Sequence, residues 1–379
     1  MPISFEIVST NESARAGVLH TDHGAVATPV FMPVGTQGAV KAATPHMLGE
    51  IGAGIILANT YHLVMRPGAD VVSALGGLHR FMSWKGAILT DSGGFQVMSL
   101  ADLRKVTSDG IAFRSHVDGA LHLFTPESAI QDQATLGADI IMALDYCAAY
   151  PCERTEAERA VALTTQWAGR AAAVYGRRFE MEGYERVIFG IVQGSTHLDL
   201  RDRSRREILD LDFPGYAIGG LSVGEEQAAT WEIVESVAGG LPADRPRYLM
   251  GMGTPVDLVN GVARGIDMFD CVMPTRNARN GTVFTRKGKL VLKNSVHTRA
   301  AGPLEEGCLC YTCRNFSRGY LRHLFNASEI LGPVLATYHN LYYYCDLMRE
   351  IRAAIELGEF CAWRVRFIEQ YNSGAADDA

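Results

Sequence analysis

Residues 267–281 read Asp-Met-Phe-Asp-Cys-Val-Met-Pro-Thr-Arg-Asn-Ala-Arg-Asn-Gly, a short apolar run that ends at Asp270 and passes into a loop rich in asparagine and arginine. From Cys271 to Ala300 the chain carries seven arginines and lysines but no aspartate or glutamate. The whole chain has a net charge of −7, so this window holds +7 and the remainder about −14. Such segregation favours a polyanion-binding site beside a carboxylate.

The run that ends near Asp270 is one of eight apolar segments that recur along the chain and end in polar or glycine-rich residues. They are Val26–Val34, Gly54–Asn59, Ala87–Asp91, Asp139–Asp145, Arg186–Val192, Tyr216–Gly219, Arg247–Met250 and Met268–Cys271. Segments this apolar on both faces predict buried parallel strands. Helical patterns lie between most of them. The leading prediction is therefore an α/β fold, a (β/α)8 TIM barrel, with a doubly wound sheet as the alternative.

Several helix starts are marked in the sequence. Thr125-Pro126 and Thr254-Pro255 each place proline in the first helical turn after a capping threonine. Thr155 with Glu158 has the spacing of a capping box and predicts a helix that runs to about Tyr175.

The regular pattern stops after the last apolar run. Gly281–Leu292 is typical of a hairpin with Lys287-Gly288 at its turn, and Ser328–Tyr371 is mostly helical in pattern. We divide the chain into a barrel with N-terminal strands (residues 1–276), an insert (277–345) and a C-terminal part (346–379) whose helix packs back on the barrel. Residues 373–379 are small and acidic and are predicted to be disordered.

The composition is that of a globular protein with an ample core: 379 residues, 47% hydrophobic and 20% charged. The N-terminus has no cationic start and no apolar signal core, and no apolar run approaches the roughly 18 residues of a membrane span. We therefore expect a cytoplasmic protein with no membrane partner. Eight cysteines in a chain of this length do not predict a disulfide framework.

Three of the cysteines, Cys308, Cys310 and Cys313, are spaced so that their thiolates can surround one tetrahedral ion. His339 is the best fourth ligand, and His323 and Cys345 are alternatives. A redox-active or incidental cysteine cluster is the less favoured interpretation. Four protein ligands leave no open position, so we expect structural Zn2+ that stabilises the insert and takes no part in the chemistry.

Three of the apolar segments end in aspartate: Asp91, Asp145 and Asp270. Catalytic groups of a (β/α)8 barrel lie at this rim, although any one of these aspartates could simply cap a turn. Paired carboxylates, one as nucleophile and one as proton donor, cleave glycosidic bonds with retention. The leaving group at the anomeric carbon could be a sugar or a nucleobase. The basic window favours the nucleobase of a nucleic acid.

Several motifs resemble those of the bacterial tRNA-guanine transglycosylase family, and the resemblance runs from about Phe5 to the C-terminal helix. The motifs are Thr90-Asp-Ser-Gly-Gly-Phe-Gln96, Gly190-Ile-Val-Gln-Gly194, Tyr216-Ala-Ile-Gly-Gly-Leu-Ser222, Asp267–Arg279 and Cys-x-Cys-x2-Cys with a distant His. The resemblance implies a barrel with an RNA-facing zinc subdomain, usually homodimeric. It also implies exchange of guanine for preQ1 at wobble position 34 of GUN-anticodon tRNAs, through a covalent aspartyl-ribosyl intermediate, in queuosine biosynthesis.

The resemblance also implies residue roles. Asp270 would be the nucleophile and Asp91 the general acid and base, while Asp267 is expected to be structural. Arg276 and Arg279 would bind the anticodon loop, and the other cations of the window would hold phosphates. The base, guanine or preQ1, would be bound by Ser92, Asp145, Cys147, Gln193, the Gly220 N–H and the Leu221 carbonyl, and would be sandwiched by Phe95 and Met250.

Four positions bear on how far these roles carry over. Family members often have tyrosine at Phe95, so the hydrogen bond of a tyrosine hydroxyl is missing here. Some have lysine at Thr254, so the RNA contact of that lysine is not expected here. Cys147 and Val223 match the bacterial pattern, whose smaller pocket admits preQ1. A catalytically silent RNA-binding subunit is one alternative, but both catalytic aspartates are present. Exchange of another deazaguanine, queuine or the archaeal precursor, is a further alternative.

Overall fold

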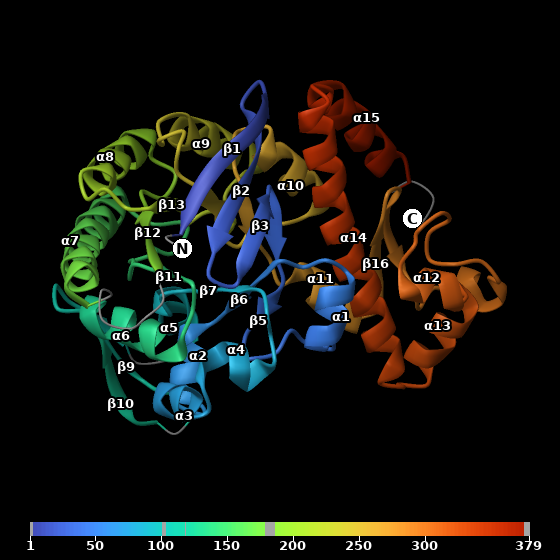
Figure 1. Cartoon of the computed structure of the whole chain (residues 1–379), viewed down its shortest axis with the longest axis horizontal. Helices are drawn as coiled ribbons and strands as arrows, with labels where there is room; N and C mark the ends of the chain where they lie inside the picture. Colours follow the sequence, from blue (N-terminus) through green and yellow to red (C-terminus); the bar gives the residue numbers. More distant parts are fainter. Residues whose placement is uncertain (1–2, 101–103, 118, 179–185, 375–379) are drawn as a thin grey trace.

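A central barrel of parallel strands is surrounded by helices, and the C-terminal elements pack on one side of it (Figure 1). The computed structural model describes residues 3–100, 104–117, 119–178 and 186–374. The largest sheet has nine strands in the order β4-β15-β14-β13-β12-β11-β7-β6-β5. Their bounds are β4 Val30–Met32, β5 Val34–Gly35, β6 Ile55–Ala58, β7 Ala87–Thr90, β11 Ile140–Met142, β12 Val187–Val192, β13 Gly215–Ile218, β14 Arg247–Leu249 and β15 Met268–Asp270.

The sheet closes into a barrel because its two terminal strands are consecutive in the chain. Only Pro33 separates β4, which pairs with β15, from β5, which pairs with β6. The Pro33 carbonyl also accepts a hydrogen bond from the Leu57 N–H at 3.0 Å. The two strands are therefore halves of one barrel strand, which leaves eight strand positions. The predicted (β/α)8 barrel is confirmed, and the doubly wound sheet is wrong.

Each of the eight predicted strand segments overlaps a barrel strand, but Val26–Val34 is not one strand. Its first residues belong to β3 (Gly24–Thr28), which forms a separate antiparallel sheet with β1 (Ser4–Asn11) and β2 (Ala14–Thr21). The reason is that Pro29 and Pro33 have no amide N–H, so the strand ladder is interrupted at both. A second antiparallel sheet, not predicted, follows β7 and consists of β8 Arg104–Val106, β9 Ile111–Arg114 and β10 Leu121–Phe124.

Helices cover the outside of the barrel (Figure 1). Thr125 and Thr254 cap their helices as predicted, because each side-chain oxygen accepts the N–H three residues on. Thr155 does not: the helix begins at Arg154, and Glu158 accepts a hydrogen bond from Arg154 instead. The helices up to the end of the barrel are α1 Pro45–Glu50, α2 Thr60–Met65, α3 Ala69–Ala74, α4 Gly77–Met82, α5 Gly94–Leu100, α6 Pro126–Leu136, α7 Arg154–Arg178, α8 Leu198–Leu209, α9 Gln227–Gly239, α10 Pro255–Val262 and α11 Met273–Arg279.

The chain after the barrel forms a hairpin and a group of helices. The hairpin is confirmed, but Thr285 pairs with Gly288, so its turn is Arg286-Lys287, one residue earlier than predicted. Residues 375–379 of the predicted disordered tail lie outside the described residues, and Ser373 ends a helix. The elements are β16 Thr282–Thr285, β17 Gly288–Val291, the 3-10 helix η2 Ser295–Arg299, α12 Tyr311–Asn315, α13 Arg318–Asn326, α14 Leu331–Glu356 and α15 Phe360–Ser373.

The long helix α14 packs between the barrel, the N-terminal sheet and the hairpin (Figure 1). Tyr344 donates a hydrogen bond to the Gly253 carbonyl at 2.7 Å, and Arg352 donates one to the Pro29 carbonyl at 2.7 Å. Among the described residues, no helix is both long and apolar enough to cross a membrane.

Both faces of the barrel strands are buried, as the continuous apolar runs predict. Met32, Leu57, Phe189 and Met268 belong to the cluster inside the barrel. The alternate residues, such as Ile56, pack against the surrounding helices. With its interior filled, the barrel can bind a ligand only at its rim.

Candidate active site and metal centre

A cavity of about 440 Å3 opens at the C-terminal rim of the barrel. It is lined by residues that follow several different strands, which is why positions far apart in the sequence meet there. The sequence-predicted residues in its wall are Asp91, Ser92, Phe95, Asp145, Cys147, Gly220, Leu221, Met250, Asp270, Arg276 and Arg279. Val223 also lines it, whereas Gln193 is not among the lining residues but donates a hydrogen bond to Asp145, which is.

Asp270 is the last residue of β15, and its carboxylate is held by two donors from the neighbouring strand β14 and the loop after it. The Tyr248 hydroxyl donates to Oδ1 at 2.6 Å, and the Gly251 N–H donates to the same oxygen at 2.7 Å. Burial raises the pKa of Asp270, and these two hydrogen bonds oppose the rise. Burial also holds the pKa of the Tyr248 phenol well above its usual range, so the phenol remains a donor.

Asp91, the first residue after β7, lies in a different environment. Asn59 donates to Oδ2 at 2.5 Å and the Thr60 N–H donates to Oδ1 at 2.8 Å. Burial raises the pKa of Asp91 to about 6, and the nearby Asp270 carboxylate adds to the rise, while the bonds from Asn59 and Thr60 lower it. A carboxyl group with such a pKa can both give and take a proton near neutral pH.

Asp145 forms a third polar group in the cavity. Gln193 donates from Nε2 to Asp145 Oδ2 at 2.7 Å, and Ser92 donates to Oδ1 at 3.3 Å. Burial raises the pKa of Asp145, and both hydrogen bonds oppose the rise. A Cβ on Gly220 would lie 2.3 Å from Gln193 Oε1, so only glycine lets the chain pass this close to the amide.

The apolar part of the cavity wall includes Phe95 and Met250. The Phe95 ring is 51% exposed, and Met250 is half-buried. Burial raises the pKa of the Cys147 thiol to about 12, so this side chain is neutral at ordinary pH. An apolar wall with a few fixed polar groups is typical of a site for a small planar ligand.

The sequence prediction missed the side chains that hold the two carboxylates, Tyr248 and Asn59. Tyr248 lies within β14, two residues before Met250. Strand alternation places these two residues on the same face, so the prediction that Met250 lines the site could have been extended to Tyr248. Asn59 was seen at the end of its strand, but nothing in the sequence links it to Asp91, because the two lie on different strands.

Asp267 has a structural role, as expected. It is fully buried at the start of β15, and Arg15 donates to its two carboxylate oxygens at 2.8 and 2.5 Å.

The cationic residues after β15 are of two kinds: most are exposed, and one is paired with carboxylates inside the protein. Arg276 and Arg279 lie on α11 and are exposed at the cavity. Arg286 instead lies between Glu305, Asp346 and Glu350, with Asp346 at 2.8 Å. Its charge is neutralised within the protein, so the expectation that it holds a phosphate is wrong. The remaining cations of the window are exposed: Lys287, Lys289, Lys293 and Arg299.

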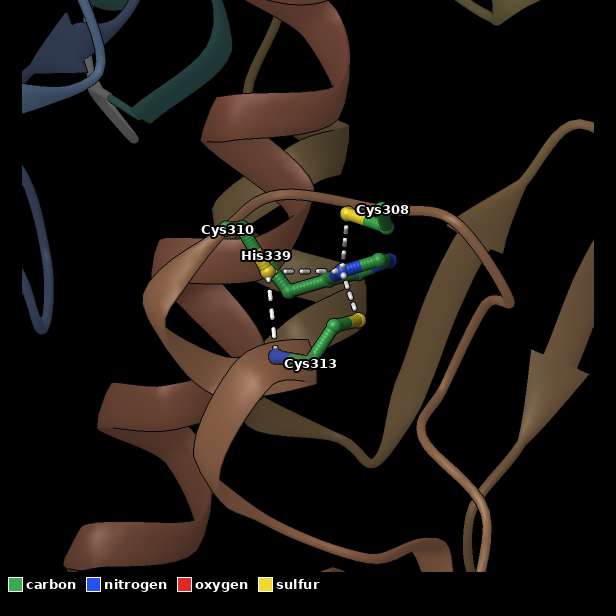
Figure 2. A group of neighbouring side chains, drawn as sticks. All are labelled: Cys308, Cys310, Cys313 and His339. Atoms are coloured by element: carbon green, nitrogen blue, oxygen red, sulfur yellow. Dashed lines mark hydrogen bonds between the residues drawn. The ribbon is translucent and has the colours of Figure 1, made fainter.

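The predicted metal ligands Cys308, Cys310, Cys313 and His339 converge (Figure 2). Their sulfurs lie 3.9, 3.4 and 3.4 Å from His339 Nδ1. Zinc bonds of about 2.3 Å to sulfur and 2.0–2.1 Å to nitrogen place tetrahedral ligands about 3.6 Å apart, so the set has the right size for this ion. His339 Nε2 lies 2.8 Å from the Phe284 carbonyl, which directs Nδ1 at the thiolates. The alternatives His323 and Cys345 are not part of this described group.

A second group of potential ligands, His23, His79 and Asp139, lies at the opposite end of the barrel, where Asp139 precedes β11. His23 Nδ1 is 2.6 Å from Asp139 Oδ1, and His79 Nε2 is 3.2 Å from Oδ2. The two imidazoles stack with centroids 3.5 Å apart and planes 10° apart. In-plane lone pairs of two parallel rings cannot point at one ion. The group therefore fits a buried carboxylate hydrogen-bonded by two imidazoles.

Comparison with known proteins shows the family of this chain. The family model described as queuine tRNA-ribosyltransferase matches residues 10–373. A protein of that name from Pelotomaculum thermopropionicum is 55% identical over 98% of this chain and 99% of its own length. Another from Symbiobacterium thermophilum is 54% identical over 100% of this chain and 94% of its own. A third, from Caldanaerobacter subterraneus, is 53% identical over 97% and 98%. The family model covers nearly the whole chain, and these three relatives are more than 50% identical to it. The chain therefore belongs to the queuine tRNA-ribosyltransferase family.

Proposed function

We propose that this enzyme exchanges guanine at position 34 of GUN-anticodon tRNAs for preQ1, through a covalent aspartyl-ribosyl intermediate, in queuosine biosynthesis. The observation that carries the proposal is the pair Asp270 and Asp91 in one cavity, each held by its own hydrogen-bond donors. The catalytically silent alternative has no support in these residues, because neither carboxylate is lost or blocked.

In this mechanism, Asp270 attacks C1′ of the target ribose. A carbon–oxygen bond forms, and the bond from C1′ to guanine breaks with its electron pair going to the base. Asp91 gives a proton to the departing guanine and takes one from the incoming base, as the reverse reaction requires. The pKa of about 6 supports this double role. Tyr248 and Gly251 orient the nucleophile by fixing one of its oxygens.

The base would bind between Phe95 and Met250, with its polar edge toward Asp145. Ser92 and Gln193, which donate to this carboxylate, would act with it in reading the edge. The Gly220 N–H would donate to the purine carbonyl, and the Leu221 carbonyl would accept from the aminomethyl amine. Cys147 and Val223 line the same cavity, and their size supports preQ1 over the larger queuine.

The anticodon loop would lie over Arg276 and Arg279, beside Asp270, with the exposed lysines of the hairpin region near phosphates. We assign Zn2+ to the three cysteines and His339, where it would hold the cysteine loop of the insert (residues 277–345) against α14, whose first part belongs to the same insert. The ion would take no part in the reaction, because its four ligands fill the tetrahedron. The C-terminal part, 346–379, shares α14 with the insert. We also propose a homodimer, which the family resemblance alone supports.

The direct test is base exchange. The protein is incubated with a GUN-anticodon tRNA and radiolabelled guanine, and then with competing preQ1 or queuine. We expect label to enter the tRNA, preQ1 to compete and queuine to compete more weakly. The absence of exchange with any base would refute the enzymatic proposal, whereas stronger competition by queuine would refute only the choice of preQ1.

A further inference from the structure

Arg201, on the inner face of α8, is fully buried, and within the described residues its side chain makes no hydrogen bond to another side chain. Its guanidinium instead donates to four backbone carbonyls. Nε donates to Ser195 at 2.8 Å, and Nη1 donates to Val192 at 3.1 Å. The remaining bonds reach the neighbouring loop, from Nη1 to Gly219 at 2.7 Å and from Nη2 to Gly220 at 3.1 Å.

These bonds join the two loops that form one side of the base site. The first loop follows β12 and begins with Gln193, and the second follows β13 and contains Gly219 and Gly220. Ser204, one turn after Arg201 on α8, accepts the Gln193 N–H at 3.0 Å. The same helix face therefore fixes both loops from behind. A rigid guanidinium fork presents five donors in a fixed plane, so it reaches acceptors on two loops with a wider span and better alignment than the three donors of a single ammonium group.

The bond to Gly219 also sets the direction of a donor in the cavity. In a trans peptide the carbonyl of one residue and the N–H of the next point in opposite directions. Because Arg201 lies behind the loop and holds the Gly219 carbonyl, the Gly220 N–H points away from it. Gly220 lines the cavity and Arg201 does not, so that direction is toward the ligand.

Arg201 also differs from an ordinary structural arginine in its electrostatic setting. All four of its hydrogen bonds in the described chain are to neutral carbonyls. Burial lowers the pKa of Arg201 to about 10, so it remains a cation at neutral pH. A buried cation on the carbonyl side of a peptide polarises the opposite N–H and makes it a stronger donor.

We infer that Arg201 is a positioning residue for the base: it aligns and polarises the Gly219–Gly220 peptide, and it locks this loop to the loop that carries Gln193. The inference rests on the proposed function, because it concerns the affinity of that site for a purine carbonyl. It adds a residue that touches neither base nor RNA to the determinants of base binding.

The test uses Arg201→Lys, which keeps the charge but loses the fork, and Arg201→Met, which loses both. We expect Arg201→Lys to raise the KM for free guanine roughly tenfold, as the loss of one well-aligned hydrogen bond would. The KM for tRNA should change by less than about threefold, because RNA contacts lie elsewhere. Arg201→Met should raise the KM for guanine further. Arg203→Lys, an exposed arginine of the same helix that pairs with Glu207 at 2.7 Å, is the matched control.

Amide hydrogen exchange gives a second measurement. Residues 193–196 and 219–222 should exchange faster together in Arg201→Lys, while the Cys310 region should not change. An unchanged KM for guanine in folded variants would overturn the inference, and so would a parallel rise in both KM values. Failure of both variants to fold would also overturn it, because Arg201 would then serve the barrel and not the site. If the wild-type protein exchanges no base, the proposed function itself fails.

Discussion

At the scale of single residues, the two carboxylates of the site differ in the hydrogen-bond donors that surround them. Asp270 and Asp91 are both buried, and burial raises the pKa of each. Asp270 is bound by a phenol and a backbone N–H on one oxygen, while Asp91 has an amide and a backbone N–H on different oxygens. The first arrangement orients a nucleophile, and the second leaves a carboxyl group that titrates near neutral pH.

The raised pKa of Asp91 predicts a pH-dependent cost in stability. A carboxyl pKa that is higher in the folded protein favours the protonated form there. Its contribution to stability is therefore present below pH 4 and is lost as pH rises through about 6. Asp91→Asn avoids this loss. Its free energy of unfolding relative to wild type should increase between pH 4 and pH 8 by roughly 3 kcal/mol at most.

Urea unfolding at several pH values measures this difference. Glu232→Gln, which makes the same chemical change at an exposed position of α9, is the control, and its free energy of unfolding should stay within about 0.5 kcal/mol of wild type. A constant difference between Asp91→Asn and wild type from pH 4 to pH 8 would contradict the assigned environment.

At the scale of elements, the Cys3His group connects the loop before α12 to α14 and, through His339, to the hairpin strand β16. The hairpin pairs in a two-stranded sheet of its own. Such small elements have little core, and a bound ion is a common way to stabilise them. The insert should therefore depend on the metal more than the barrel does.

Substitution of one ligand tests this dependence. Cys310→Ser should lower the zinc content from about one ion per chain to a small fraction and should lower the Tm. Tight binding of tRNA should weaken, since the exposed lysines lie on the released hairpin. Cys345→Ser, at a buried cysteine of α14 outside the ligand group, is the control and should keep its zinc by metal analysis. Equal zinc loss in both variants would argue against the ligand assignment.

The comparison between sequence and structure also belongs at this scale. The barrel strands were predictable because each is a continuous apolar run that is buried on both faces. Val26–Val34 misled because two prolines divide an apolar run into three strands. The strands β8–β10 were missed because each includes a polar residue and is partly exposed, so none forms a continuous apolar run. The strand-end aspartates followed from barrel geometry, but their donors depend on contacts between strands, which spacing does not reveal.

At the scale of the whole molecule, structural polar groups lie at one end of the barrel and the proposed catalytic groups lie at the other. The N-terminal end of the strands holds the buried Asp139, which contacts two stacked imidazoles, and the C-terminal end holds the cavity. The long helix α14 connects this barrel to the metal centre and the N-terminal sheet (Figure 1). Negative charge over most of the chain and the exposed cations beside the cavity would direct an RNA to the rim.

The central claim is that this rim forms a covalent bond with tRNA through Asp270. The measurement that tests it most directly is denaturing electrophoresis of the protein after incubation with a GUN-anticodon tRNA. We predict a denaturant-resistant adduct for the wild-type protein, and none with a tRNA that lacks guanine at position 34. Asp270→Asn should form no adduct, while its Kd for tRNA should stay within about threefold of wild type, because the RNA contacts lie elsewhere. An undiminished adduct in Asp270→Asn would contradict the account.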